Sequence, residues 1–344
     1  MAPRILVDVT HPAHVHFFRP AMRIWQEKGY ELIVVARDKD VTLELLDHYG
    51  FDYTVLSKAR SGLAGLALEL LEHEGRLLKV IRREKPDVLL EVAGTFIVHA
   101  AALTRTPSLV FYDTEHASLS NAITYPFATK IITPESYRGD LGNKHIRYNG
   151  YQELAYLHPK YFRPDPSVLN ELGLAEKEKY TIVRFVSWDA SHDRGQKGIT
   201  LEFGRQLVDR LLKYGRVFIS AEGALPAEFE PYRLRLPAHR MHDALAFAHL
   251  YIGEGATMAS EAAILGTPAV YINTLSLGYI EEQEGMYGLV RRCVDGAEII
   301  ETIDRIFERD AASEERHCQR ERLLNDKIDV TLFISEFVEK DLSI

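Results

Sequence analysis

Three histidines follow directly on the first strand-like segment of the sequence, residues 4–9. His11, His14 and His16 have the spacing His-x-x-His-x-His. Open α/β domains place their ligands at the carboxyl edge of the sheet, where such a segment ends. A neutral imidazole there can act as a general base on an acceptor hydroxyl, and a protonated one can neutralise phosphate charge. We expect His14 or His16 to take one of these two roles. Turn-capping histidines are one alternative, and a zinc site is another, although no nearby Cys or carboxylate cluster completes a ligand set.

A second cluster of candidate residues follows the strand-like residues 250–253. Gly255 and Ala256 precede Thr257, Met258 and, one helical turn further on, Glu261. Small residues allow a ligand to approach the backbone, and the unpaired amides of a first helical turn favour negative charge. We predict a diphosphate site here, with Thr257 as the N-cap and Glu261 accepting hydrogen bonds from a ribose diol. The alternative is that Thr257 only caps the helix and Glu261 is a solvated first-turn acid.

The segments that must position these residues alternate between short β-branched runs and longer helix-periodic runs, which is typical of parallel βαβ units. Strands are expected at residues 5–9, 31–36, 87–92, 108–111, 130–133, 180–186, 216–220, 250–253 and 268–272. Turn-forming residues concentrated at 149–166 mark a domain boundary. We therefore predict two doubly wound Rossmann-like α/β domains, residues 1–160 and 161–325. A terminal helix at 326–344 either returns to the first domain or lies on the surface.

Composition favours a globular protein with two cores. The 344 residues exceed what one hydrophobic core usually supports, and 46% of them are apolar and 26% charged. The formal net charge of −9 disfavours nucleic-acid binding, whereas backbone amides can still hold a small anionic ligand. Cys293 and Cys318 lack metal-type or redox-motif spacing, and the first residues lack the pattern of a signal peptide. We expect a cytoplasmic protein.

A basic, amphipathic segment lies in the first half of the chain. Such a segment can touch an anionic membrane, but most are a solvated helix face, and the sequence favours the solvated face. The basic residues are Arg60, Arg76, Lys79, Arg82, Arg83 and Lys85.

Residues 255–268 resemble the "SGG…E…LGKP" segment of UDP-N-acetylglucosamine 2-epimerases and the related segment of the glycosyltransferase that forms lipid II. In those families the small residues bind the diphosphate and the glutamate binds the ribose, which implies the same roles for residues 255–257 and Glu261. The preceding stretch looks like the loop and helix that carry the nucleotide base in GT-B enzymes. The resemblance implies that the backbone near His239 and Arg240 pairs with the base while Met241 packs on its ring. A solvent loop that enters an amphipathic helix is the alternative.

Two segments of the first half extend the resemblance. The histidine segment looks like the GGxGH loop of lipid II-forming transferases, in which a histidine approaches the acceptor or the phosphates, but a His-Pro-Ala run replaces the glycines. Residues 110–121 resemble the "HVEAGLRT" stretch of the 2-epimerases, whose glutamate takes part in catalysis. This implies a catalytic role for Glu115, with His116 beside it. A polar loop in which Asp113 or Thr114 caps the next helix is the alternative.

Two departures weigh against epimerase chemistry. The aspartate of the epimerases' "GDT" segment corresponds here to Gly94 and Thr95, which removes an acid–base group. Their "HRREN" pattern is not reproduced either. Arg184, Ser187 and His192, which stand in its place, are still candidates for contacts with phosphate or sugar, and a structural role is the alternative.

Over nearly its full length the chain resembles an uncharacterised family of GT-B-like proteins, marked by its His-Pro-x-His-Val-His, Asp-Thr-Glu-His and Glu-Gly-Ala-Thr-Met segments. The resemblance implies a GT-B arrangement with a ligand cleft between the domains. We expect a glycosyltransferase of cell-surface or other glycan biosynthesis, without metal or cofactor. It takes a nucleoside-diphosphate sugar, most simply a UDP-sugar, and an acceptor near His14, His16 and Glu115. A 2-epimerase-like enzyme and a catalytically silent nucleotide-sugar-binding protein are the alternatives.

Overall fold

The computed structural model describes residues 2–116, 118–175, 177–185, 200–221, 223–275, 277–308 and 312–342. The chain divides into two compact units: unit 1 is Met1–Tyr156 with Lys327–Ile344, and unit 2 is Leu157–Asp326. Each unit is built on a parallel sheet covered by helices, which confirms the predicted pair of α/β domains. Two of the candidate residues, Ser187 and His192, lie outside the described residues. No helix of the described chain combines the length and the apolar character needed to cross a bilayer.

Unit 1 has a seven-stranded parallel sheet in the order β3-β2-β1-β4-β5-β6-β7. Its strands are β1 (Arg4–Val9), β2 (Glu31–Asp38), β3 (Thr54–Lys58), β4 (Val88–Val92), β5 (Ser108–Phe111), β6 (Lys130–Pro134) and β7 (His145–Tyr148). The sequence did not predict the outer strands β3 and β7. They are edge strands with polar and partly exposed residues, so they lack the continuous apolar run that marks a central parallel strand.

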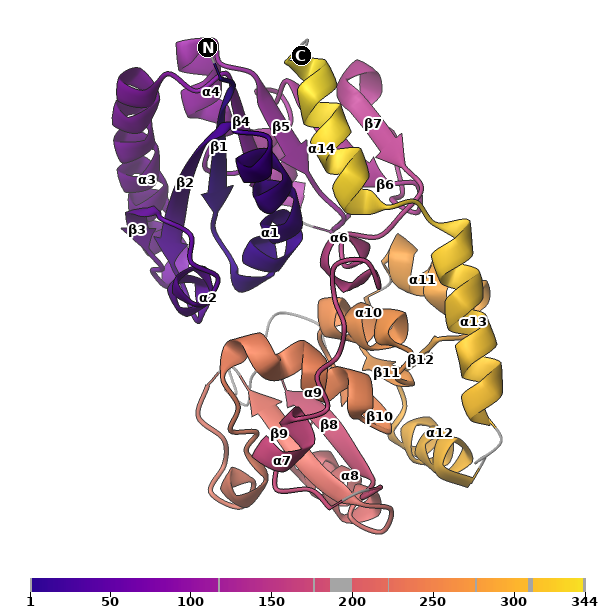
Figure 1. The fold of residues 1–344 in the computed structure, drawn as a ribbon. Coiled ribbons are helices and arrows are strands. Elements are labelled where there is room, and N and C mark those ends of the chain that lie inside the picture. Colours follow the sequence, from indigo (N-terminus) through magenta and orange to yellow (C-terminus); the bar gives the residue numbers. More distant parts are fainter. Residues whose placement is uncertain are drawn as a thin grey trace. The chain divides into compact units, whose positions relative to one another are not determined.

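Helices cover both faces of this sheet. Side chains of α3 (Gly62–Glu84) and α4 (Val98–Thr104) pack on one face in a cluster that includes Leu77, Val98 and Val110. On the other face Phe17 and Phe18 of α1 (Pro12–Glu27) contact Phe111. The terminal helix α14 (Val330–Asp341) lies beside α1 in unit 1 (Figure 1). The remaining helices are α2 (Thr42–His48), α5 (Ser118–Thr124), the 3-10 turn η1 (Gly142–Lys144) and α6 (Leu154–Leu157), which ends at the start of unit 2.

Unit 2 has a five-stranded parallel sheet in the order β12-β11-β10-β8-β9. Its strands are β8 (Tyr180–Phe185), β9 (Arg216–Ala221), β10 (Leu250–Gly253), β11 (Ala269–Ile272) and β12 (Val290–Cys293). The helices are α7 (Val168–Glu171), α8 (Leu201–Leu211), α9 (Met241–Phe247), α10 (Ala256–Leu265), α11 (Gly278–Gly285), α12 (Gly296–Glu308) and α13 (Ala312–Asp326), with 3-10 turns η2 (Glu230–Tyr232) and η3 (Ala238–Arg240). The sequence did not predict β12, in which two arginines interrupt the apolar pattern.

The strand order of each sheet reverses direction at one place. In unit 1 the chain builds outward from β1 to β3 and then returns to add β4 on the other side of β1. In unit 2 the same reversal falls between β8 and β10. Ligands of open parallel sheets bind at such switch points, outside the carboxyl ends of the strands. The functional residues are therefore to be sought at the ends of β1 and β4 and of β8 and β10.

Candidate functional site

Two carboxylates occupy the switch point of unit 1. Asp8 of β1 and Glu91 of β4 are register partners, so their side chains lie on the same face of the sheet, and both are fully buried. Glu91 Oε2 accepts hydrogen bonds from the backbone amides of Phe96 and Ile97, at 3.0 and 3.1 Å. Burial and the neighbouring charge of Asp8 raise the pKa of Glu91 well above its usual range. The surroundings therefore favour the protonated form of Glu91.

A buried hydrogen-bond network holds Asp8 in place. His73 of α3 bonds to Asp8 Oδ2 through Nε2, at 2.7 Å, and to Ser57 Oγ through Nδ1, at 2.8 Å. Beyond Ser57, Glu69 is hydrogen-bonded to Arg37. The hydrogen-bonded chain of Ser57, His73 and Asp8 resembles a catalytic triad in residue types. It does not provide a nucleophile, because Ser57 and His73 are buried and inaccessible to any substrate. The network instead fixes α3 to the edge of the sheet and sets the orientation of the Asp8 carboxylate.

His14 lies next to this network. Its Nδ1 is 3.1 Å from Thr10 Oγ1, and Thr10 Oγ1 donates to Glu91 Oε1 at 3.4 Å. Burial, and then the nearby positive groups of His11, Lys39 and Arg37, lower the pKa of His14 well below its usual value. The imidazole is thus neutral at physiological pH, which is the form that accepts a proton.

The other histidines of the segment have structural surroundings. Helix α1 begins at Pro12, so His14 and His16 lie in its first turns rather than in a loop, and the expected loop is reduced to Thr10 and His11. His11 is the N-cap, and its Nδ1 accepts a hydrogen bond from the Ala13 amide at 3.2 Å. His16 is buried and stacks on a tyrosine of α6, residue 156, with ring centroids 5.5 Å apart.

His14 and His16 are therefore not brought together on one ligand. Side chains two residues apart point to different sides of a helix, and here His14 contacts Thr10 whereas His16 stacks on Tyr156. Among the described residues, no group of three or more His, Cys, Asp or Glu side chains is placed to hold a metal ion.

The segment after β5 places acidic residues at the next strand end. Glu115 is half-buried and its Oε1 accepts a hydrogen bond from the Arg138 amide at 3.2 Å, while His116 is exposed. Asp113 accepts a hydrogen bond from the Thr114 hydroxyl at 3.0 Å. Burial, opposed by that hydrogen bond and reinforced by the charge of Glu115, raises the pKa of Asp113 to about 6. Asp113 is thus a stronger base than an ordinary carboxylate.

Gly94, where epimerases carry their aspartate, is a position that accepts no side chain. Its backbone is left-handed, with φ of 74°, and a Cβ atom there would lie 2.4 Å from Val110 Cγ2 and 3.0 Å from Thr124 Cγ2. Such contacts are far inside van der Waals distance. The next residue, Thr95, is hydrogen-bonded to Ser120 at 2.9 Å. The packing of this strand end is therefore incompatible with an aspartate at residue 94.

In unit 2, the turn between β10 and α10 lies at the switch point. Gly253 is the register partner of Arg184, and a Cβ atom on Gly253 would lie 2.4 Å from Tyr251 Oη. Helix α10 begins at Ala256 and its N-cap is Gly255, so the prediction of Thr257 as N-cap was wrong. The chain adopts the extended N-cap conformation at Gly255, two residues after the end of β10, so Thr257 lies exposed in the first turn. No side chain caps this helix start.

Helix α10 carries Glu261 on its inner side. Glu261 is buried rather than solvated, and its Oε1 lies 3.0 Å from Nε2 of His242 in α9. This contact orients the carboxylate. The helix ends with Gly266 as its C-cap, at a left-handed φ of 90°. Met258 is half-buried one residue after Thr257.

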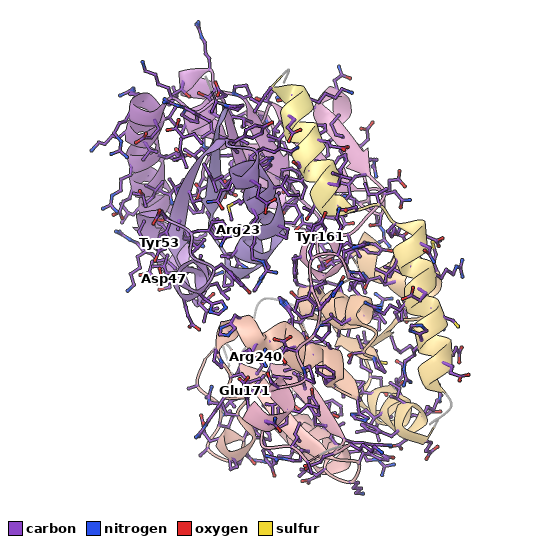
Figure 2. All side chains as sticks on the ribbon, viewed as in Figure 1. Arg23, Asp47, Tyr53, Tyr161, Glu171 and Arg240 are labelled. Carbon is purple, nitrogen blue, oxygen red and sulfur yellow. The ribbon has the colours of Figure 1, made fainter. Side chains whose placement is uncertain are left out.

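The remaining candidates of unit 2 differ in their surroundings. Arg184 donates to Ser220 Oγ at 2.8 Å, and His239 and Met241 are half-buried at the start of α9. Arg240 is bound within the unit: its guanidinium donates to Glu171, and further to Asp165, Asp243 and Ser167. Figure 2 shows Arg240 and Glu171 side by side. Any part that Arg240 takes in binding a base therefore falls to its backbone.

Several residues of the site were not predicted from the sequence. Asp8 and Glu91 lie within the strand segments, and His73 and His242 lie on helices remote in sequence from their partners. A signal existed for the two carboxylates. Each is a charged residue near the end of an otherwise apolar buried strand, a position at which an ionisable group is costly unless it has a function or a partner.

Solved structures with the same fold include nucleotide-sugar enzymes. The UDP-GlcNAc 2-epimerase of Neisseria meningitidis bound to UDP-GlcNAc aligns with a TM-score of 0.69 at 14% identity, over 98% of this chain and 100% of the other. The S. aureus MnaA–UDP structure aligns with 0.69 at 13%, over 99% and 97%. The spinosyn rhamnosyltransferase SpnG with spinosyn aglycone aligns with 0.61 at 13%, over 97% and 99%. At these identities the likeness establishes the fold.

Sequence comparison gives a relative and a family. The chain is 27% identical to the uncharacterized protein MJ0665 of Methanocaldococcus jannaschii over 277 residues, which are 77% of this chain and 80% of the relative. The model of a family described as "Protein of unknown function (DUF354)" matches residues 4–338.

Proposed function

Because the chain belongs to the DUF354 family, whose description assigns no reaction, we propose its activity from its own residues: a glycosyltransferase that takes a nucleoside-diphosphate sugar, most simply a UDP-sugar. The donor binds at the β10–α10 turn of unit 2, and the acceptor binds at the strand ends of unit 1. The fold supports a nucleotide-sugar ligand, because solved proteins that share it hold UDP or UDP-GlcNAc.

The β10–α10 turn is the observation that carries the proposal. The turn lies at the switch point, glycines at residues 253 and 255 leave Glu254 as the one side chain between β10 and α10, and the ten-residue helix that follows has no side-chain cap. The first-turn amides of Ala256, Thr257 and Met258 offer hydrogen bonds and a favourable dipole to a diphosphate. Glu261, oriented by His242, accepts hydrogen bonds from the ribose diol.

The neighbouring segments complete the donor site. The backbone of His239 and Arg240, at the start of α9, pairs with the base, and the half-buried Met241 packs on its ring. Arg184, register partner of Gly253, contacts a phosphate. Ser187 and His192, which follow β8 in the sequence, are proposed as further contacts to phosphate or sugar. The amides and these polar side chains stabilise the departing nucleotide.

Unit 1 supplies the base for the acceptor. His14 is neutral at physiological pH, and Asp113 has a pKa of about 6, so both are competent to take a proton from a hydroxyl. Glu115 and His116 stand on the same strand end as Asp113 and are proposed to position the acceptor. His16 is proposed to support the acceptor site through its packing.

Epimerisation of the sugar is the weaker candidate. It requires acid–base groups on the sugar carbon, and the packing around Gly94 leaves no room for the aspartate of the 2-epimerases. The carboxylates at the ends of β1 and β4, Asp8 and Glu91, are buried and hydrogen-bonded to His73 and to backbone amides. They are not accessible to a sugar.

Product analysis tests the proposal. The full-length protein is incubated with radiolabelled UDP-sugars, with and without a cell extract as the source of acceptor. The proposal predicts UDP release that depends on the extract and places the label on a new product. Glu261→Gln should abolish this transfer, whereas Glu298→Gln, at a partly exposed first-turn acid of α12 in an ion pair with Arg291, should leave it unchanged. A sugar epimer or free sugar formed without extract, or nucleotide binding without turnover, would contradict it.

A further inference from the structure

In the first turns of α3 the burial of polar and apolar side chains differs from that of an ordinary surface helix. Glu69 and His73 point inward and are fully buried, in the network that reaches Asp8. Leucines are exposed instead. Leu63, Leu66, Leu68 and Leu71 are 81%, 46%, 56% and 69% exposed. Leu66, three residues before Glu69, shares the side of the buried residues, whereas Leu68 and Leu71 lie on the outward side. A helix of a folded unit normally turns its apolar side chains to the core, so these exposed leucines point to a partner that takes them out of water.

The same side of the helix continues into cations. Leu68, Leu71, Gly75, Lys79 and Arg82 follow one another at spacings of three or four residues, which places them in one stripe along the helix. Gly75 carries no side chain that would separate the leucines from the basic residues. Lys79 and Arg82 are exposed and form no ion pair with any other described residue. The stripe is thus apolar toward the start of α3 and positive toward its end.

Acidic residues of α3 do not offset this charge. Each of its four glutamates is engaged: Glu69 with Arg37, Glu72 with Arg60 and Arg76, Glu74 with His99, and Glu84 with Arg83. None of the four is more than 30% exposed. A chain of net charge −9 therefore carries, on this helix, a surface of unpaired positive charge beside exposed leucines.

We propose that the outward stripe of α3 docks on the surface of an anionic lipid bilayer. The leucines at the start of the helix enter the boundary between headgroups and acyl chains, and Lys79, Arg82 and Lys85 meet the anionic headgroups. Protruding apolar side chains in line with cations are the features of an interfacial helix. The proposal does not depend on the reaction assigned above.

A second copy of the chain fits the stripe less well. Two-fold pairing of antiparallel helices about Gly75 would place Leu68 and Leu71 of one copy over Lys79 and Arg82 of the other. The cations would then lose water against apolar side chains without gaining a counter-charge, which is unfavourable. A bilayer supplies both the apolar layer and the negative charge.

Vesicle sedimentation of the full-length protein tests the proposal. Vesicles of phosphatidylcholine alone are compared with an equal mixture of phosphatidylcholine and phosphatidylglycerol. We expect binding to the mixed vesicles that weakens as NaCl is raised, and much weaker binding to the neutral ones. The variants Leu68→Glu/Leu71→Glu and Lys79→Gln/Arg82→Gln should each bind the mixed vesicles about tenfold more weakly or worse. The matched control Leu212→Glu/Met286→Glu, at exposed apolar positions of unit 2, should bind as the unsubstituted protein does.

Insertion is read out directly with a tryptophan in the stripe. The emission of Leu71→Trp should shift to the blue when mixed vesicles are added, and that of Leu212→Trp should not. The proposal is overturned if the unsubstituted protein ignores mixed vesicles at low salt, if the leucine variant binds them equally well, or if the Leu71→Trp emission does not move. It is also overturned if light scattering shows a dimer that the leucine substitutions dissociate, because the stripe would then be an interface between copies.

Discussion

Asp8 and Glu91 are register partners in adjacent parallel strands, and both carboxyl groups are buried at the point where the strand order of unit 1 reverses. Burial and the neighbouring carboxylate of Asp8 raise the pKa of Glu91, which favours its protonated form. His73 holds the Asp8 carboxylate through a buried hydrogen bond. Hydrogen bonds of Thr10 connect the end of β4, through Glu91, to His14.

Replacement of Glu91 tests its protonation. The folded-state pKa of Glu91 is raised, so its contribution to stability is complete below the ordinary carboxyl pKa and is lost as pH rises through the folded pKa. Glu91→Gln mimics the protonated form, so we expect it to fold and to lose less stability than the unsubstituted protein between pH 5 and pH 8. Glu91→Ala removes the acceptor of two buried amides and should cost about 2–4 kcal/mol.

Urea denaturation at several pH values measures both effects. If Glu91→Gln is destabilised as strongly as Glu91→Ala at every pH, Glu91 is ionised in the folded protein and its assignment as the protonated partner of Asp8 is incorrect.

Gly94 gives a prediction about packing. Gly94→Ala adds a Cβ atom 2.4 Å from Val110 Cγ2 in a left-handed backbone, so we expect a loss of about 2–4 kcal/mol in the free energy of unfolding. Gly75→Ala is the control, because that helical glycine has open space around it and alanine should stabilise α3 by about 0.5–1 kcal/mol. Equal stability of the two variants in thermal or urea unfolding would show that residue 94 tolerates a side chain.

The raised pKa of Asp113 leads to a prediction of how the transfer activity falls at acidic pH. A base with a pKa of about 6 is lost by protonation below that pH, so kcat/KM for transfer should fall tenfold per pH unit below about pH 6. Asp113→Asn should lower kcat more than KM and remove this dependence, whereas Asp140→Asn, at an exposed aspartate of the same unit, should leave the profile intact. A profile that Asp113→Asn leaves unchanged would assign the base to another group.

How far the sequence predicted the molecule depends on the range of the interactions involved. Central strands such as β1, β4 and β10 were predictable because burial on both faces makes most of their residues apolar. The end of α10 was predictable from Gly266, since a left-handed C-cap is a local requirement. Its start was not, because Thr257 is an equally good cap by residue type and only the path of the chain out of β10 selects Gly255.

The candidate site was predicted less completely than the fold. Glu261 and Glu115 stand in local motifs, but the partner of Glu261 is His242 on another helix, and the partner of Asp8 is His73, 65 residues away in sequence. Pairing of this kind is set by tertiary packing. The same holds for Arg240, because no local sequence pattern predicts its contacts within unit 2.

Nucleotide binding to the full-length protein tests the central claim most directly. Thermal unfolding is followed with UDP, other nucleoside diphosphates and UDP-sugars, each with and without EDTA. The account predicts a rise in Tm of about 5 °C at a ligand concentration far above Kd. This rise should survive EDTA. It should be lost or weakened at least tenfold in apparent Kd by Glu261→Gln, to a lesser degree by His242→Gln, and not by Glu298→Gln. No shift with any nucleotide, or a shift that Glu261→Gln leaves unchanged, would contradict the donor site at the β10–α10 turn.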